Sequence, residues 1–286
     1  MIVLFLPSTA RAMLGLMFRR PFLLAAGGAC ASLMTAAPLC AAQEKPKAVV
    51  VVGVSNAPGL GYAIAKRFAQ GGMNVGIVGR QKERLEECKA AILKEVPGAQ
   101  VVCSAADATD PAQCARAFSE LAAANGAADA LVYNMASRPM PTVAVADLDP
   151  ERLKRDWATG PYAALLCAQQ VLPAMREAGS GSILITGASA SLRGNAKFGS
   201  FSVAKSGLRV LAQSLAKEVA PEGIHVAHVI IDAMVDMPML TKFVPDAPPG
   251  KLLDTDAAAE VYWNLYQQQK RCYTFEVDVR PYLSQW

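Results

Sequence analysis

From Lys47 onward, short runs of β-branched and apolar residues alternate with longer stretches of helical pattern. The short runs predict seven strands, at 47–54, 74–79, 99–104, 129–134, 181–187, 224–231 and 273–279. The longer stretches predict helices at about 60–70, 81–95, 111–124, 151–178, 202–220 and 256–269. An alternation of this kind is typical of repeated βαβ units around a parallel sheet.

The strand runs are apolar throughout, as in VVVVGV at 49–54. Because such a strand must be buried on both faces, we expect helices on both sides of the sheet. The sequence therefore predicts an α/β, doubly wound Rossmann fold with a parallel sheet of about seven strands, in one domain over 44–286. The proline-rich stretch 237–251 predicts a loop or lid beside the carboxyl edge of the sheet.

Residues 1–43 differ in character from the rest of the chain. They carry Arg11, Arg19 and Arg20 but no acidic residue, and Phe22–Ala42 is an uncharged run of 21 residues. A helix of that length spans about 31 Å, which is enough to cross the hydrocarbon core of a bilayer. We predict an N-terminal targeting or membrane-anchor segment, with a mitochondrial, membrane-associated location as the leading interpretation.

Two other interpretations of this leader stay open. Its arginines, its apolar run and the small residues near Ala42 also fit a cleaved import or export signal. The pair Arg19 and Arg20, followed by Phe22, also resembles a twin-arginine signal for export or for plastids.

Charge and cysteine use exclude some functions. The three leader arginines account for most of the net charge of +4, so the remainder is near neutral. No basic cluster interleaved with aromatic residues indicates nucleic-acid binding. The seven cysteines occur singly and without zinc-ligand spacing, which predicts no metal site and free thiols in a reducing compartment.

A glycine-rich segment, GVSNAPGLG, follows the first predicted strand directly. Glycines at a strand-to-helix turn let the backbone approach a pyrophosphate, and the next helix offers unpaired N–H groups at its start. The strand before it and the helix after it strengthen this interpretation. We therefore assign cofactor binding to Gly53, Ser55, Gly59, Leu60 and Gly61.

Over Lys47–Trp286 the chain resembles the short-chain dehydrogenase/reductase (SDR) family, and the long spacing from Gly53 to Gly59 resembles its divergent, enoyl-reductase-like branch. The resemblance implies further cofactor contacts. Arg80, at the end of the second strand, stands where NADP-preferring members place a basic residue, so NADP(H) is favoured over NAD(H). Asp107 matches the family's adenine-contacting aspartate, and Asn134 matches the first residue of its N-A-G motif.

Members of that family transfer hydride while a tyrosine acts as acid or base. A lysine four residues later lowers the tyrosine pKa and holds the ribose, and a serine and an asparagine complete the group. Here the Y-x-x-x-K segment reads FSVAK, so Phe201 stands at the tyrosine position and Lys205 remains. The serine and asparagine positions hold Ala188 and Gly160. In the enoyl-reductase register, the tyrosine position falls on Phe198.

The nicotinamide end departs further from the family. Its Pro-Gly pair reads Ile231 and Asp232, and its threonine reads Met237. The sequence does not identify a substitute proton donor. A donor must first lie within hydrogen-bonding reach of the substrate, and only then does its pKa matter. The candidates are Ser189 and Tyr162 first, then His225, His228, Arg193, Asn195 and Lys197.

Three functional hypotheses follow. The leading one is an NADP(H)-binding protein with a degenerate catalytic site, a non-catalytic or weakly catalytic accessory subunit of a mitochondrial membrane assembly. The alternative is an active NADP-dependent oxidoreductase of a carbonyl or enoyl substrate with a non-standard proton donor. The third is a scaffold that binds no nucleotide. The resemblance also implies a homo-oligomer that pairs through the helices at 151–178 and 202–220.

Overall fold

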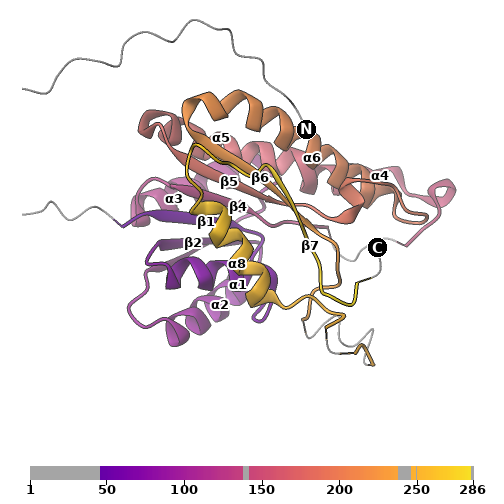
Figure 1. Ribbon diagram of the computed structural model, residues 1–286, viewed down its shortest axis with the longest axis horizontal. Helices are drawn as coiled ribbons and strands as arrows, with labels where there is room; N and C mark the ends of the chain where they lie inside the picture. The colour runs from indigo at the N-terminus through magenta and orange to yellow at the C-terminus, as the bar shows by residue number, and fades with distance from the viewer. Residues whose placement is uncertain (1–45, 138–141, 238–245, 249, 285–286) are drawn as a thin grey trace, which may run out of the picture. The chain divides into compact units, whose positions relative to one another are not determined.

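The computed structural model describes residues 46–137, 142–237, 246–248 and 250–284 (Figure 1). Their strands form one parallel sheet in the order β3-β2-β1-β4-β5-β6-β7. The strands are β1 (Ala48–Val52), β2 (Asn74–Gly79), β3 (Val101–Ala105), β4 (Ala130–Tyr133), β5 (Gly181–Thr186), β6 (Ile224–Ile231) and β7 (Glu276–Val279). This confirms the predicted doubly wound α/β fold.

Helices cover both faces of the sheet, as Figure 1 shows. One face carries α1 (Leu60–Gln70), α2 (Lys82–Glu95) and α8 (Thr255–Tyr266). The other carries α3 (Pro111–Asn125), α5 (Ala163–Ala178) and α6 (Gly199–Val219). Every residue of β1 and of β6 is buried, as strands between two helical layers should be.

Several helices start where the sequence provides a cap. Asp110 accepts a hydrogen bond from the backbone N–H of Gln113 at the start of α3, and Pro111 follows it. In the same way, Asp149 caps α4 (Pro150–Trp157) ahead of Pro150. A capping carboxylate satisfies an N–H that the helix leaves unpaired, and proline fits the first helical position because it lacks that N–H.

The helix predicted at 151–178 is interrupted. It divides into α4, a π-helical turn η2 (Ala158–Tyr162) and α5. Pro161 has no N–H to donate, and Gly160 leaves the helical region with φ −85° and ψ −109°. The apolar pattern continues through the interruption, which explains why periodicity alone predicted one helix.

The described part of the chain also contains three 3₁₀ turns: η1 (Val145–Asp147), η3 (Ser189–Ser191) and η4 (Ala220–Glu222). The leader 1–43 lies outside the described residues, as does most of the predicted loop or lid at 237–251. Among the described helices, none combines the length and the apolar character needed to cross a bilayer. Of the seven cysteines, five lie in the described part, and all five are free thiols.

Candidate cofactor and active site

The glycine turn between β1 and α1 has close backbone contacts that leave no room for a side chain at Gly53 or Gly61. Gly53 has φ +96°, and a Cβ atom there would lie 2.5 Å from the carbonyl oxygen of Asn134. A Cβ atom on Gly61 would lie 2.8 Å from the carbonyl oxygen of Gly53. The turn, the start of α1 and the segment after β4 are thus packed closely together at these two glycines.

The first turn of α1 offers hydrogen-bond donors to a ligand. Its N-cap residue, Gly59, is extended, and no side chain in the described part of the chain caps this end. Leu60 and Gly61 begin the helix, so their N–H groups have no partner within it. Ser55 lies exposed in the turn before them. An uncapped helix start beside close-packed glycines fits the pyrophosphate of a dinucleotide.

Two basic residues lie on elements that follow the glycine turn in the chain: Arg80 after β2 and Arg84 on α2. Arg80 is exposed directly after β2. Arg84, on the first part of α2, donates from Nη1 to Oδ1 of Asn56 in the glycine turn, at 3.1 Å. Sequence reasoning did not single out Arg84 or Asn56, because only the fold brings them together. The Arg84 guanidinium at the turn, with Arg80 directly after the neighbouring strand β2, suits an additional phosphate on the ribose.

Two further predicted cofactor-binding residues, Asp107 and Asn134, follow β3 and β4. Asp107 lies after β3, and its Oδ1 accepts from the N–H and the hydroxyl of Thr109, at 2.9 and 2.7 Å. Asn134 lies after β4, and its Nδ2 would be 3.0 Å from a Cβ atom on Gly61. Asn134 therefore packs against the glycine turn at Gly53 and Gly61.

Lys205 is buried in α6, with only 4% of its surface exposed. Its ammonium group donates to the carbonyl oxygens of Thr186, at 2.8 Å, and of Met135, at 3.2 Å. Burial lowers the pKa of Lys205 to about 8, because an ammonium group loses hydration in the interior. Phe201 lies one turn earlier on α6, with its ring centroid 6.0 Å from the Lys205 nitrogen.

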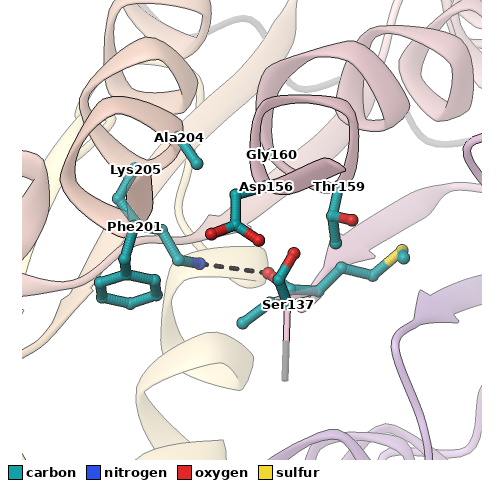
Figure 2. Close-up of a pocket in the computed structure, with 9 residues that line it drawn as sticks. Ser137, Asp156, Thr159, Gly160, Phe201, Ala204 and Lys205 are labelled. Atoms are coloured by element: carbon teal, nitrogen blue, oxygen red, sulfur yellow. Dashed lines mark hydrogen bonds between the residues drawn. The ribbon is translucent and has the colours of Figure 1, made fainter. Parts of the chain in front are cut away.

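Phe201 and Lys205 face a small cavity, around which Figure 2 shows the Asp156 carboxylate, Thr159 and Ser137 as well. Its lining comes from the segment after β4, from α4 with η2, and from α6. The residues are Met135, Ala136, Ser137, Asp156, Thr159, Gly160, Phe201, Ala204 and Lys205. The structure thus brings together three of the four positions that the resemblance assigned to catalysis: Gly160, Phe201 and Lys205.

Asp156 is a member of this cavity that the sequence analysis missed. It is 2% exposed, and its oxygens accept from Arg152 Nε at 2.8 Å and from the Ser200 hydroxyl at 2.6 Å. Arg152 lies four residues before Asp156 and Gly160 four residues after it. Residues four apart share a face of a helix, and this spacing could have linked Asp156 to the site. Ser137 and Thr159 were also missed.

Other sequence candidates lie elsewhere. Ala188 and Ser189 are at the start of η3, and neither belongs to the described lining of the cavity. Tyr162 stacks on Trp157, with ring centroids 5.6 Å apart, and it does not line the cavity either. Arg193, Asn195 and Lys197 are exposed in the loop before Phe198. No group of three or more metal-binding side chains occurs among the described residues.

The order of strands reverses between β1 and β4, and the glycine turn, Asn134 and Lys205 all lie near that reversal. An open parallel sheet binds its ligand at such a point, beyond the carboxyl ends of its strands. Fold and site together define a dinucleotide-binding α/β protein.

The sequence profile of the short chain dehydrogenases matches residues 47–247, and the chain belongs to this family. It is 30% identical over 231 residues to an uncharacterized short-chain type dehydrogenase/reductase of Sinorhizobium fredii, covering 76% of this chain and 89% of that protein. A short-chain dehydrogenase from Rhodopseudomonas palustris has 32% identity and a TM-score of 0.68, over 82% of this chain and 99% of that one. A metagenomic short-chain oxidoreductase solved with NADP has 25% identity and a TM-score of 0.70, over 83% and 98%.

Proposed function

We propose that the chain is an NADP(H)-binding SDR protein that performs the family's tyrosine-dependent reaction weakly or not at all. One observation carries this proposal: the phenyl ring of Phe201, which has no proton to donate, lies one helical turn before Lys205 and faces the same cavity. Reduction of a carbonyl needs a proton on oxygen as hydride reaches carbon, so loss of the hydroxyl removes the family's acid.

In this proposal the residues assigned to the cofactor from the sequence divide its parts among them. Gly53, Ser55, Gly59, Leu60 and Gly61 would hold the pyrophosphate at the start of α1. Arg80, with Arg84 nearby, would hold the 2′-phosphate of NADP(H), and Asp107 would contact the adenine. Asn134 and Lys205 would hold the nicotinamide ribose. NADP(H) supplies hydride chemistry when bound, and a related short-chain oxidoreductase was solved with NADP.

In this proposal the bound nucleotide mainly stabilises the fold, because a ligand that binds only the folded state shifts the unfolding equilibrium. The acid-free leader with its uncharged run at 22–42 supports a role as an accessory subunit on a mitochondrial membrane. Export, or a plastid location, is the alternative for that leader. Exposed Trp157, Leu165, Val203 and Val210 on α4, α5 and α6 support pairing with a second copy or a larger complex.

Isothermal titration with NADPH and NADH, followed by an assay of NADPH oxidation with carbonyl substrates, tests the proposal. We expect NADPH to bind more tightly than NADH, and the wild-type protein to turn over slowly. Phe201→Tyr should raise the rate by about 10-fold or more if the hydroxyl is what the site lacks. Brisk reduction by the wild-type protein would overturn the proposal. An absence of binding heat at millimolar NADPH would favour the scaffold hypothesis.

A second candidate is an active NADP-dependent oxidoreductase in which Lys205 donates the proton. The observation in its favour is that burial brings the pKa of Lys205 to about 8, near the pH at which an acid of this kind works best. In that case the Lys205 ammonium would give a proton to the substrate carbonyl oxygen, and bound NADPH would supply the hydride for the carbon. Wild-type turnover that falls as the pH rises through about 8 would support it, since the acid form of Lys205 is then lost.

A further inference from the structure

A buried histidine lies beneath the candidate site. His228, on β6, is fully buried, and its Nδ1 is 3.0 Å from Oε2 of Glu276 on β7. The Glu276 carboxylate also accepts from Nε and Nη2 of Arg209 on α6, at 2.6 and 2.8 Å. These bonds to Arg209 lower the pKa of Glu276, so it is ionised and can only accept. The hydrogen of neutral His228 is therefore on Nδ1, and Nε2 has a lone pair.

The Nε2 atom points at the segment that anchors Lys205. A Cβ atom on Gly187 would lie 2.1 Å from it, so only glycine permits this approach. Gly187 follows Thr186, whose carbonyl oxygen accepts from the Lys205 ammonium at 2.8 Å. His228 and Lys205 thus contact adjacent residues of one short segment. The Nε2 atom has no hydrogen-bond partner in the described part of the chain.

The surroundings disfavour a proton on that nitrogen. Burial lowers the pKa of His228, Glu276 opposes this effect, and the charges of Lys205 and Arg209 add to the lowering. Both cations come from α6, Glu276 comes from β7, and Gly187 at the end of β5 brings no charge. A proton on Nε2 would therefore have no acceptor in the described part of the chain and would be repelled by the charge of Lys205.

We propose that protonation of His228 weakens the binding of NADP(H) at Lys205, and that bound NADP(H) disfavours protonation of His228. His228 is then a positioning residue that tunes cofactor affinity. The proposal rests on the proposed function, in which Lys205 contacts the nicotinamide ribose. A charged His228 repels the ammonium and disturbs its anchor at Thr186, so the cofactor binds less tightly. By linkage, bound cofactor must resist protonation of His228 by the same factor.

The chain has only two histidines, and the other is a matched control. His225 lies on the same strand, is also buried, and stacks on Tyr273 with ring centroids 4.2 Å apart. The experiment measures NADP⁺ affinity by titration calorimetry at pH 7.5 and pH 5.5, in the wild type, His228→Phe and His225→Phe. Phenylalanine keeps the ring volume and cannot titrate. The 2′-phosphate of the ligand, whose second pKa is about 6, titrates equally in all three proteins.

NADP⁺ affinity should fall from pH 7.5 to pH 5.5 in all three proteins. We expect this fall to be larger by a factor of about five or more in the wild type and His225→Phe than in His228→Phe. A merely structural role for His228 would lower stability but leave the pH dependence equal in all three proteins, and that result would overturn the proposal. Failure of the wild type to bind NADP⁺ at pH 7.5 would instead overturn the proposed function.

A second measurement needs no variant at His228. Proton–nitrogen NMR of the wild-type histidine rings, followed from pH 7.5 downward with and without saturating NADP⁺, should show two titrating rings. His225→Phe assigns them. The ligand should lower the pKa of His228 and leave that of His225 unchanged. If NADP⁺ binds and the pKa of His228 does not fall, the proposal is wrong even where His228→Phe does not fold.

Discussion

Gly160 and Ala204 bring two helical segments into backbone contact. A Cβ atom on Gly160 would lie 3.0 Å from the carbonyl oxygen of Ala204 and 3.1 Å from its methyl group. Ala204 precedes Lys205, so this contact fixes the turn of α6 that carries the buried ammonium against η2. At the position that resembles the family's asparagine, the absence of a side chain thus permits a close approach of η2 to α6.

Substitution of Gly160 by alanine or asparagine should consequently destabilise the protein. The added atoms meet the backbone of α6 and the methyl group of Ala204, which must shift, and such overpacking costs about 1–3 kcal/mol. Chemical unfolding monitored by circular dichroism measures the loss. Gly194→Ala is the control, because a Cβ atom at Gly194 has nothing within 4 Å and no positive φ opposes it. Equal stability of Gly160→Asn and the wild type would show that η2 can move away from α6.

The fold was predictable because the hydrophobic patterns of strands and of helices alternate clearly along the chain. Each of the seven strand predictions overlaps a strand in the structure, and runs such as 49–54 gave the burial of the sheet correctly. The error came at Gly160 and Pro161, where the apolar pattern passes without change through a π-helical turn. Hydrophobic periodicity reports which face is buried, and it does not report the loss of a backbone hydrogen bond.

The candidate site was predictable where its residues are neighbours in the sequence. The glycine turn was predicted from its place between a strand and a helix, and Lys205 from the resemblance of the FSVAK segment to the family's Y-x-x-x-K motif. Asp156, by contrast, meets Ser200 across 44 positions, and His228 meets Glu276 across 48. Such pairs depend on how helices and strands are placed in space, and a single sequence carries little signal for that placement. For Asp156, the sequence offered one signal, which is its helical spacing from Arg152 and Gly160.

Lys205 should make folding stability depend on pH in the alkaline range. Its pKa is about 8 in the folded protein and about 10.4 in an unfolded chain. Between these values the unfolded state binds more protons, so stability rises with pH through this window and is lowest below it. Relative to Lys205→Met, the wild type should gain about 2.5 kcal/mol between pH 8 and 10.5.

Urea unfolding of both proteins across that range measures the difference, and groups common to the two proteins cancel. Lys205→Met leaves the carbonyl oxygens of Thr186 and Met135 without this donor, but that loss is the same at every pH. A constant difference between the two proteins would mean that Lys205 titrates near its usual value despite its burial.

Arg80→Ala should change the choice of cofactor. Loss of a guanidinium partner for the 2′-phosphate should weaken NADPH binding about 10- to 100-fold, since hydrogen bonds to charged groups contribute about 1.5–3 kcal/mol. NADH lacks that phosphate, so its affinity should stay unchanged. Titration calorimetry with both nucleotides measures the ratio, and Arg176→Ala, which removes a surface arginine paired with Glu222, is the control. Equal losses for NADPH and NADH would place Arg80 away from the 2′-phosphate.

Asp156 should matter for stability more than an exposed acid of the same helix. The wild-type carboxylate accepts from Arg152 and Ser200 while almost fully buried, so it ties α4 to the start of α6. Asparagine has one acceptor oxygen and turns an amide N–H₂ toward one of these donors, so Asp156→Asn should cost about 3 kcal/mol. Ser200→Ala removes one hydrogen bond and keeps the charge pair, and should cost about 1 kcal/mol.

Asp149→Asn makes the same chemical change at the start of α4, but its side chain is exposed and asparagine caps a helix as well as aspartate does. Its cost should stay within about 0.5 kcal/mol. Urea unfolding of the three variants should therefore rank Asp156→Asn first, Ser200→Ala second and Asp149→Asn last. If Asp156→Asn falls to the level of Asp149→Asn, the carboxylate does not hold the two helices together. Its position in the cavity beside Lys205 would then need a reason in ligand binding, because a buried charge without a stabilising role is costly to keep.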